Sequence, residues 1–322
     1  MSTPALKVRD LNVWFETGSG RTPVVDHISF SINAGDATGL VGESGCGKTM
    51  TAMAILGLLP ATGMGISCAG IEVNGKDIHM LDTAQRRTVL GRDIAMIFQQ
   101  PATALDPVFT IGQQVSAVAR RHTSGSKKDI RQTMLDTLES VGFSQPEDIA
   151  AAYPHQLSGG MRQLAMIAMA TVCKPAVIIA DEPTTALDGS SRVLILQQLK
   201  RLQTLHRTAI LFISHDLAVV RQCCHDIMVM YCGRLVETTD CHSLFSNARH
   251  PYSAGLLSCI PQISASRPPP VSSIPGQVPA ATDLPPGCHF APRCTRAEAR
   301  CKVSVPELDF ENGRGAACFR PL

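Results

Sequence analysis

Short, mainly apolar runs recur along the first two thirds of the chain, separated by longer segments with a helical pattern. Residues 37–41, 176–180 and 209–214 are runs of this kind, and each ends at a glycine or polar residue. Because a strand covered on both faces has no polar side, these runs predict the central parallel strands of an α/β sheet. A helix is predicted over 48–58, with Pro60 closing it.

Other segments have the alternation of half-exposed strands. Residues 6–34 alternate apolar and polar positions around a glycine-containing turn, and residues 70–78 surround Asn74-Gly75, so both predict antiparallel pairs. Residues 227–231 and 234–237 predict a last hairpin. Between residues 101 and 160 the pattern is helical, most clearly over 130–141, which predicts a separate helical subdomain.

The turn after the first apolar run carries a complete G-x-x-x-x-G-K-[ST] motif. It consists of Gly42, Glu43, Ser44, Gly45, Cys46, Gly47, Lys48 and Thr49. Backbone N–H groups of such a loop point at the β- and γ-phosphates of ATP, helped by the positive end of the following helix. Lys48 is expected to neutralise phosphate charge and Thr49 to ligate Mg²⁺. Cys46 stands at a helix N-terminus, so we expect its thiol to have raised thiolate character.

The second apolar run ends in Asp181 and Glu182. An aspartate at the end of a strand suits the Mg²⁺ shell, and the next carboxylate can polarise an attacking water molecule. Alone, Asp-Glu-Pro would equally fit a charged turn. Beside the phosphate-binding loop, the catalytic interpretation is favoured.

A second glycine-rich run, Leu157 to Gln163, lies ahead of this pair, with 18 residues from Gln163 to Asp181. With it the chain resembles the ABC ATPases. The resemblance implies an α/β fold with a P-loop, RecA-like core, an antiparallel β subdomain and a helical subdomain. It implies that Ser158, Gly159, Gly160 and Gln163 act on the ATP of a partner subunit. Asp188 would belong to the D-loop that touches that partner, although the following Gly189-Ser-Ser-Arg192 departs from the family pattern.

The same resemblance assigns three further residues. Gln99 corresponds to the glutamine that contacts Mg²⁺ and the γ-phosphate side, and His215 to the γ-phosphate switch histidine. Phe15 corresponds to the aromatic residue that stacks on adenine. A histidine or an aromatic residue at a strand is more often structural, so these roles depend on the resemblance. The neighbours Gln100 and Trp14 are the alternative registers.

Composition changes after the last predicted hairpin. Seven of the 22 residues in 266–287 are proline, which predicts an extended linker. The ATPase domain is therefore predicted to span 1–255, and a C-terminal extension to span 256–322. We expect this extension to form a core separate from that of the phosphate-binding loop.

The extension contains Cys288, Cys294, Cys301 and Cys318, spaced C-x5-C-x6-C-x16-C. Disulfides are disfavoured for an ATPase in a reducing compartment. The paired spacing of zinc sites and the usual ferredoxin spacings are both missing, so the spacing leaves zinc, an iron–sulfur cluster and free thiols open.

The residues around these cysteines resemble the tail of oligopeptide and dipeptide importer ATPases. The resemblance is carried by Pro285-Pro-Gly-Cys288-His-Phe-Ala-Pro-Arg-Cys294, by Ala317-Cys318-Phe, and by His250-Pro-Tyr-Ser-Ala-Gly-Leu-Leu257. It implies a [4Fe–4S] cluster on the four cysteines, with zinc as the alternative.

Charge and hydropathy bear on the partners of the chain and on its location in the cell. The formal net charge is +2, which gives no electrostatic argument for binding nucleic acid. The first 20 residues are too polar for a signal peptide, and no apolar stretch approaches the ~18 residues that span a bilayer. With the resemblance, this predicts a peripheral subunit on the cytoplasmic face of the inner membrane.

The sequence therefore predicts an ATP-binding, ATP-hydrolysing subunit of an ABC importer that takes up peptides or similar small solutes. The expected cofactor is Mg-ATP. The expected partners are a second ABC ATPase subunit (a heterodimer being favoured over a homodimer), two transmembrane permease subunits and, indirectly, a solute-binding protein. The alternatives are a soluble ABC ATPase of DNA repair or translation, and an importer of a nickel chelate, an opine or glutathione.

Overall fold

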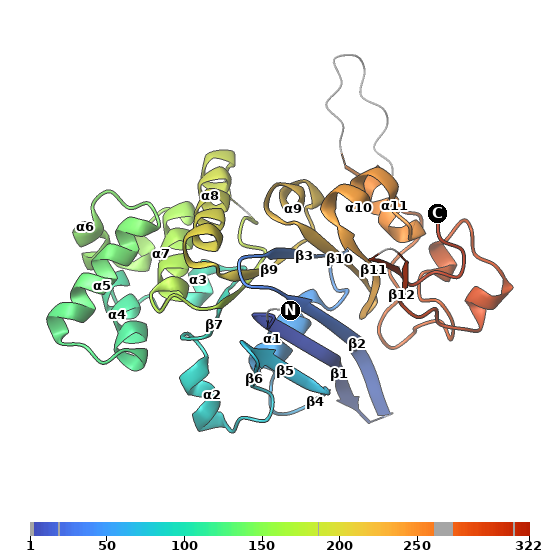
Figure 1. Cartoon of the computed structure of the whole chain (residues 1–322), viewed down its shortest axis with the longest axis horizontal. Helices are drawn as coiled ribbons and strands as arrows, with labels where there is room; N and C mark the ends of the chain where they lie inside the picture. The colour runs from blue at the N-terminus through green and yellow to red at the C-terminus, as the bar shows by residue number, and fades with distance from the viewer. Residues whose placement is uncertain (1–2, 19, 186, 261–272, 312) are drawn as a thin grey trace, which may run out of the picture. The chain divides into compact units, whose positions relative to one another are not determined.

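The computed structural model describes residues 3–18, 20–185, 187–260, 273–311 and 313–322 (Figure 1). The chain divides into two compact units. The first unit consists of Met1–Lys7, Ser31–Ala37 and Ile71–Phe212. The second consists of Val8–Phe30, Thr38–Gly70 and Ile213–Leu322, so each unit is assembled from segments far apart in the sequence.

The second unit contains the phosphate-binding loop and the C-terminal extension. Its elements are β1 (Leu6–Thr17), β2 (Gly20–Ile32), β3 (Ala37–Val41), α1 (Lys48–Leu56), β4 (Met64–Ser67), α9 (Leu217–Cys223), β10 (Asp226–Tyr231), β11 (Arg234–Asp240), α10 (Cys241–Asn247), α11 (Pro251–Ser258), η2 (Ala291–Arg293), η3 (Ala299–Lys302), β12 (Asp309–Glu311) and β13 (Arg314–Ala316).

The strands of this unit form two groups. One runs in the order β12-β13-β11-β10-β3, with β3 and β10 parallel and the other pairs antiparallel. All five residues of β3 are buried, as its apolar run predicts. In the other group β1 lies next to β2 and pairs antiparallel with β4. The predicted antiparallel segment near the N-terminus and the predicted last hairpin are both present.

The first unit contains the second and third apolar runs. Its elements are β5 (Gly70–Val73), β6 (Lys76–Asp77), α2 (Thr83–Val89), β7 (Ile94–Ile97), α3 (Pro101–Ala104), α4 (Ile111–His122), α5 (Lys127–Ser140), α6 (Pro146–Ala151), η1 (Pro154–Gln156), α7 (Gly159–Thr171), β8 (Val177–Asp181), α8 (Gly189–His206) and β9 (Ala209–Ser214).

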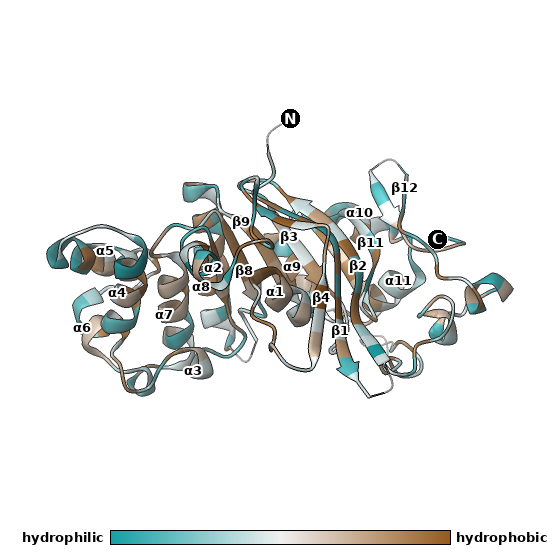
Figure 2. Cartoon of the chain, turned by 90° about the horizontal axis from the view of Figure 1, so that it is seen from below, coloured by the Kyte–Doolittle hydropathy of each residue, from teal (hydrophilic) through white to brown (hydrophobic). Residues whose placement is uncertain are grey.

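Strands β7, β8 and β9 are neighbours in the order β9-β8-β7, and β7 is parallel to β8. Every residue of β8 and β9 is buried, and Figure 2 shows both strands as hydrophobic. Polar side chains appear only at the C-terminal ends of these strands, Asp181 in β8 and Ser214 in β9. The short hairpin β5–β6 turns at Asn74-Gly75, as predicted.

The helices α4, α5, α6 and α7 pack together as the predicted helical subdomain (Figure 1). Two of them begin with a capping box, Thr110 with Gln113 in α4 and Ser126 with Asp129 in α5. Helix α5 buries Ile130, Met134 and Leu138, which follow one another at helical spacing. Within the described ranges, no helix is both long and apolar enough to span a bilayer.

The C-terminal extension differs from its expected form. Its strand β13 pairs with β11, so it continues the sheet that contains β3. The extension and the phosphate-binding loop belong to the same compact unit, and the expectation of a separate core is therefore wrong. The part of the predicted proline-rich linker in 266–272 lies outside the described residues.

Glu237 of β11 fixes the start of α11. Its side chain is completely buried, and its two carboxylate oxygens accept hydrogen bonds from the backbone N–H groups of Arg249 and His250, each at 2.8 Å. A buried carboxylate of this kind satisfies donors that would otherwise lack partners. It thereby holds the helix that carries Tyr252 in place.

Replacing Glu237 by alanine is expected to lower the free energy of unfolding by roughly 3 kcal/mol, because two buried N–H groups lose their acceptor. The measurement is urea denaturation followed by circular dichroism. The matched control is Glu139→Ala at an exposed position of α5, for which we expect a change within about 0.5 kcal/mol. Equal midpoints for the two variants would contradict this role of Glu237.

Candidate functional site

The loop between β3 and α1 is held by close backbone packing. A Cβ atom at Gly42 would lie 2.2 Å from the carbonyl oxygen of Met230, and one at Gly47 would lie 2.7 Å from that of Val24. Gly47 is also the N-cap of α1 and has φ +108°, a conformation that glycine adopts without strain. No side chain caps α1, so the N–H groups of its first turn face the loop.

Lys48 lies inside this loop. Its side chain is buried, and Nζ donates to the carbonyl oxygens of Gly42 at 2.8 Å and Glu43 at 2.9 Å. Ser44, Gly45 and Thr49 are exposed at the rim. A cationic group surrounded by loop carbonyls and unpaired helix N–H groups is an arrangement suited to binding an anion.

Cys46 corrects one expectation. Its side chain is only 1% exposed, and Sγ lies 3.6 Å from Lys48 Nζ. Burial raises the pKa of the Cys46 thiol in spite of the nearby ammonium group. The predicted thiolate character is therefore wrong, because loss of hydration outweighs the helix N-terminus and Lys48.

Phe15 and His215 also belong to the second unit. Phe15, at the end of β1, is 42% exposed, so its ring is available on the surface. Its neighbour Trp14 is covered instead by Arg21, whose guanidinium carbon lies 4.5 Å from the centre of the Trp14 ring. His215 follows β9 and is exposed. Of the two neighbouring aromatic residues, Phe15 is therefore the one whose ring is exposed for stacking on a ligand.

The carboxylate pair lies in the first unit at the end of β8. Asp181 is 2% exposed and Glu182 half-buried, with Glu182 in the left-handed region at φ +47°. Glu182 Oε2 accepts hydrogen bonds from Gln99 Nε2 at 3.1 Å and from Thr185 Oγ1 at 2.8 Å. Strained backbone at a carboxylate held by two donors is typical of a functional site. The structure thus brings together Gln99, rather than Gln100, and Glu182.

The signature run begins α7. Ser158 is its N-cap, with Oγ accepting from the Met161 N–H at 3.3 Å, and both Ser158 and Gly159 are exposed. A Cβ atom at Gly160 would lie 2.5 Å from Ser191 Oγ, so a larger residue there would require the Ser191 side chain to move. Gln163 is 2% exposed, and its side chain therefore packs inside the unit and not at its surface.

Asp188 caps α8 with its exposed carboxylate. Oδ1 accepts from the backbone N–H groups of Ser190 and Ser191, each at 3.0 Å, and both hydroxyls also donate to the carboxylate. These hydrogen bonds, those of Ser190 foremost, hold the pKa of the Asp188 carboxyl well below its usual value. The Gly-Ser-Ser sequence that departs from the family pattern thus provides the hydroxyl donors of this cap.

The four cysteines of the extension line one small pocket with His250, Phe290 and Phe319. All four are free thiols, and burial, followed by neighbouring thiols, raises the pKa of Cys288 and Cys318. In the part of the chain that the structure describes, no three His, Cys, Asp or Glu side chains are arranged to hold a metal ion. The structure therefore brings the four thiols to one pocket without placing three of them as metal ligands.

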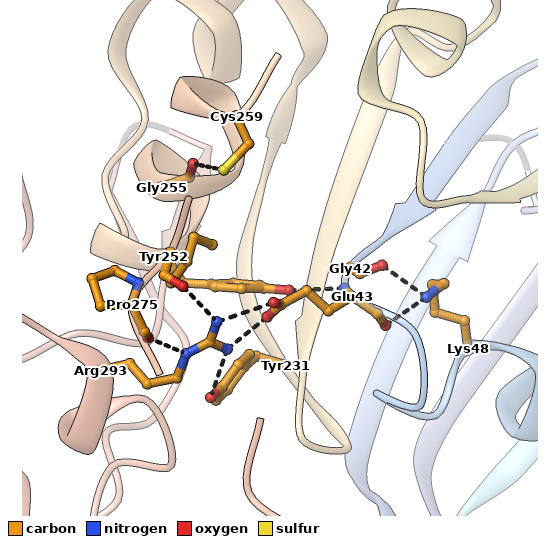
Figure 3. A network of polar contacts seen from close by, with 10 residues as sticks. Gly42, Glu43, Lys48, Tyr231, Tyr252, Gly255, Cys259, Pro275 and Arg293 are labelled. Atoms are coloured by element: carbon orange, nitrogen blue, oxygen red, sulfur yellow. Dashed lines mark hydrogen bonds and ion pairs between the residues drawn. The ribbon is translucent and has the colours of Figure 1, made fainter. Parts of the chain in front are cut away.

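Sequence reasoning missed one partner of the loop. Arg293 of η2 forms an ion pair with Glu43, and Tyr252 of α11 contacts the backbone of Glu43 (Figure 3). The position of Arg293, directly before Cys294, was the only available signal. The tail pattern from Pro285 to Cys294 includes Arg293 but does not indicate a role for it.

Two family models match the chain. Residues 25–185 match the model described as ABC transporter, and residues 236–301 match that of the oligopeptide/dipeptide transporter C-terminal region. The first covers the phosphate-binding loop, the signature run and the carboxylate pair. The second covers α11, Arg293 and three of the four cysteines.

Curated relatives match along almost the whole chain. The chain is 42% identical to the dipeptide transport ATP-binding protein DppD of Escherichia coli, over 98% of this chain and 97% of the relative. It is equally 42% identical to the oligopeptide transport ATP-binding protein AppD of Bacillus subtilis, over 99% of this chain and 97% of the relative.

Solved structures agree with the fold. CbiO1 of Clostridium perfringens, part of an ABC transporter complex, has a TM-score of 0.65 and 26% identity, over 76% of this chain and 91% of that one. The ATP-binding cassette MJ0796, a dimer bound to ADP and Pi, has a TM-score of 0.64 and 25% identity, over 73% of this chain and 98% of that one. The predicted fold class is confirmed.

The burial of Cys46 gives a testable expectation. In the native protein its thiol is expected to react with a maleimide on the order of 100-fold more slowly than in guanidinium chloride, because labelling needs a local opening of the loop. Quantitative mass spectrometry of the peptide containing Cys46 measures both rates. Comparable rates in the native and unfolded chain would contradict the closed packing of the loop.

Proposed function

The chain belongs to the ABC transporter family, as an ATP-binding subunit with the C-terminal region of oligopeptide and dipeptide transporters, and we propose that it energises the import of peptides. It is an ATPase coupled to transport. The observation that carries the peptide assignment is the full-length match to two peptide-transport relatives, which includes the C-terminal extension.

Binding of ATP is assigned to residues 42–49. The uncapped N-terminus of α1 and the buried Lys48 suit the triphosphate, and Phe15 offers an exposed ring for stacking on adenine. Mg²⁺, when bound, neutralises phosphate charge; Thr49, Asp181 and Gln99 carry the oxygen atoms that suit it. Lys48 orients the phosphates through its ammonium group.

Hydrolysis is assigned to Glu182 as the base that positions and deprotonates water. Its Oε2 atom accepts hydrogen bonds from Gln99 and Thr185, which orient the carboxylate beside the loop that follows β8. His215, exposed at the end of β9, is assigned to sensing the γ-phosphate. These roles follow from the match to the family together with the geometry around Glu182.

A second ATPase subunit is proposed to complete each site. Ser158 and Gly159 are exposed at the N-terminus of α7, where they are free to contact the nucleotide of a partner, with Gly160 behind them. Asp188 is proposed to contact the partner beside them. The solved dimer of MJ0796 is a precedent for pairing, and we favour a heterodimer here. Buried Gln163 is proposed to support this helix start from within.

The other proposed partners are two transmembrane permease subunits and, indirectly, a solute-binding protein. The chain would act on the cytoplasmic face of the inner membrane as a peripheral subunit. The domain division into an ATPase domain over 1–255 and an extension over 256–322 is proposed on the second family match, which starts at residue 236, together with the sequence.

We also propose that the extension holds a metal centre, a [4Fe–4S] cluster rather than zinc. The support is chemical: Cys288, Cys294, Cys301 and Cys318 come from separate turns and yet line one pocket, and four thiols are the usual donor set of such a cluster. When bound, the group would crosslink turns that have little apolar core of their own.

Replacing Glu182 by glutamine tests the transport function. The amide keeps the shape of the side chain but cannot take a proton, so ATP hydrolysis by the assembled transporter should fall by at least ~100-fold while ATP binding persists. In cells lacking the native chain, wild-type protein should restore uptake of a radiolabelled dipeptide and Glu182→Gln should not. Glu139→Gln, at an exposed position of α5, is the control expected to restore uptake fully.

Two outcomes would contradict the proposal. Normal dipeptide uptake in cells that lack the chain would refute the peptide assignment. Substantial ATP hydrolysis by the Glu182→Gln complex would refute the role of Glu182 while leaving the peptide assignment intact.

Metal analysis tests the proposed cluster. Protein purified without air should be brown and contain about four iron atoms per chain, and Cys294→Ser should lose most of that iron. Cys173→Ser, outside the extension, is the matched control expected to keep it. A content of one zinc and no iron per chain would refute the iron–sulfur cluster and assign a zinc site instead. A metal-free wild-type protein would refute any metal centre in the extension.

A further inference from the structure

The second residue of the phosphate-binding loop is held by the C-terminal extension. Glu43 accepts two hydrogen bonds from one guanidinium group, from Arg293 Nη1 at 2.7 Å and from Arg293 Nη2 at 3.0 Å (Figure 3). The Arg293 side chain is 4% exposed and that of Glu43 29% exposed. This is a bidentate, largely desolvated ion pair between segments 250 residues apart in sequence.

Arg293 is itself oriented by several groups. Its Nε donates to the carbonyl oxygen of Pro275 at 2.9 Å, and Nη1 lies 3.4 Å from the hydroxyl oxygen of Tyr231. The rings of Tyr231, Tyr252 and Phe290 pack against one another, with centroids 4.6 to 5.3 Å apart. The guanidinium therefore has one well-defined position, at the end of a rigid aromatic cluster.

The same cluster contacts the loop backbone. The N–H group of Glu43 donates to the hydroxyl oxygen of Tyr252 at 2.9 Å, while Lys48 Nζ donates to the carbonyl oxygen of Glu43. The backbone and the carboxylate of Glu43 are thus both fixed from outside the loop. A shift of Arg293 or Tyr252 would be transmitted directly to the atoms beside Lys48.

A carboxylate at this place is electrostatically unfavourable for the ligand of the loop. A nucleoside triphosphate adds several negative charges close to Glu43, and the carboxylate would repel them in a partly buried setting. A bidentate guanidinium removes most of that repulsion and fixes the carboxylate in one orientation. Lysine would neutralise the charge through a single point contact and would not fix the orientation.

We propose that Arg293 is a positioning residue for nucleotide binding, which neutralises and orients Glu43 so that the loop accepts a triphosphate. The proposal rests on the assignment of residues 42–49 as the ATP-binding loop. It also makes nucleotide affinity depend on the extension, because η2 ends at Arg293 and the next residue is Cys294. The expectation that the loop is independent of the cysteine segment is corrected by this contact.

The test is isothermal titration of the full-length protein with Mg-ATP. Arg293→Ala leaves the Glu43 carboxylate without its counter-charge and should weaken binding roughly tenfold. Glu43→Gln removes the repelling charge and should bind ATP at least as tightly as the wild type. The double variant Glu43→Gln, Arg293→Met has neither charge and should bind within about threefold of the wild type.

The opposite effects of the two single variants separate this role from a purely structural one. If the ion pair only held the extension in place, Glu43→Gln and Arg293→Ala would weaken ATP binding equally. In the assembled transporter, Arg293→Ala should raise the KM for ATP and leave kcat nearly unchanged, because the guanidinium does not touch the reacting atoms. Arg293→Lys, which keeps the charge, should lose less than Arg293→Ala.

The matched control is Glu311→Gln. It breaks another ion pair of the extension, between Glu311 and Arg249 at 2.6 Å, which does not touch the loop. ATP affinity equal to the wild type is expected for this control. If Arg293→Ala does not fold, the ATP affinity of the double variant tests the proposal, because that variant leaves neither charge unpaired.

Three results would overturn the inference: wild-type affinity in Arg293→Ala, equal weakening by Glu43→Gln and Arg293→Ala, or a tenfold loss in the folded double variant. Failure of the wild-type chain to bind ATP at all would instead refute the assignment of the loop, and with it the proposed function. The two failures are therefore distinguishable in one set of titrations.

Discussion

The site depends on a backbone-to-backbone contact between the phosphate-binding loop and the turn of the β10–β11 hairpin. The Gly233 N–H donates to the carbonyl oxygen of Cys46 at 2.9 Å, and Gly42 lies so close to Met230 that a Cβ atom has no room. This contact sets the shape of the loop without any side chain of its own. It also places Tyr231, the last residue of β10, next to Arg293, the side chain that donates to the Glu43 carboxylate.

Local physical rules were sufficient to predict the elements that carry the chemistry. The apolar runs at β3, β8 and β9 are buried on both faces, and the polar residues that end them are the candidate site residues. The resemblance had assigned Gln99 rather than Gln100, and in the structure Gln99 donates to Glu182. The buried Gln163 shows the limit of motif reading, because a motif does not state which of its side chains point inward.

The remaining features depend on long-range contacts that leave no local pattern. The proline-rich composition predicted a detached extension. That prediction failed because the pairing of the three-residue strand β13 with β11 leaves no pattern in a single sequence. The ion pair of Glu43 with Arg293 joins two ordinary charged residues, each of which would be assigned to a solvated surface by default. The reactivity predicted for Cys46 failed for a related reason: burial by distant segments outweighed its local position at a helix N-terminus.

The β12–β13 hairpin has a consequence for the solubility of the subunit. Without it, β11 would be the edge of its sheet, a mostly buried strand with backbone groups available for pairing with another chain. The hairpin replaces that edge by β12, three exposed residues that include Asp309 and Glu311. A short, negatively charged edge strand resists intermolecular pairing. The extension thus leaves the sheet with a shorter edge than β11 would provide, and so with fewer backbone groups available to another chain.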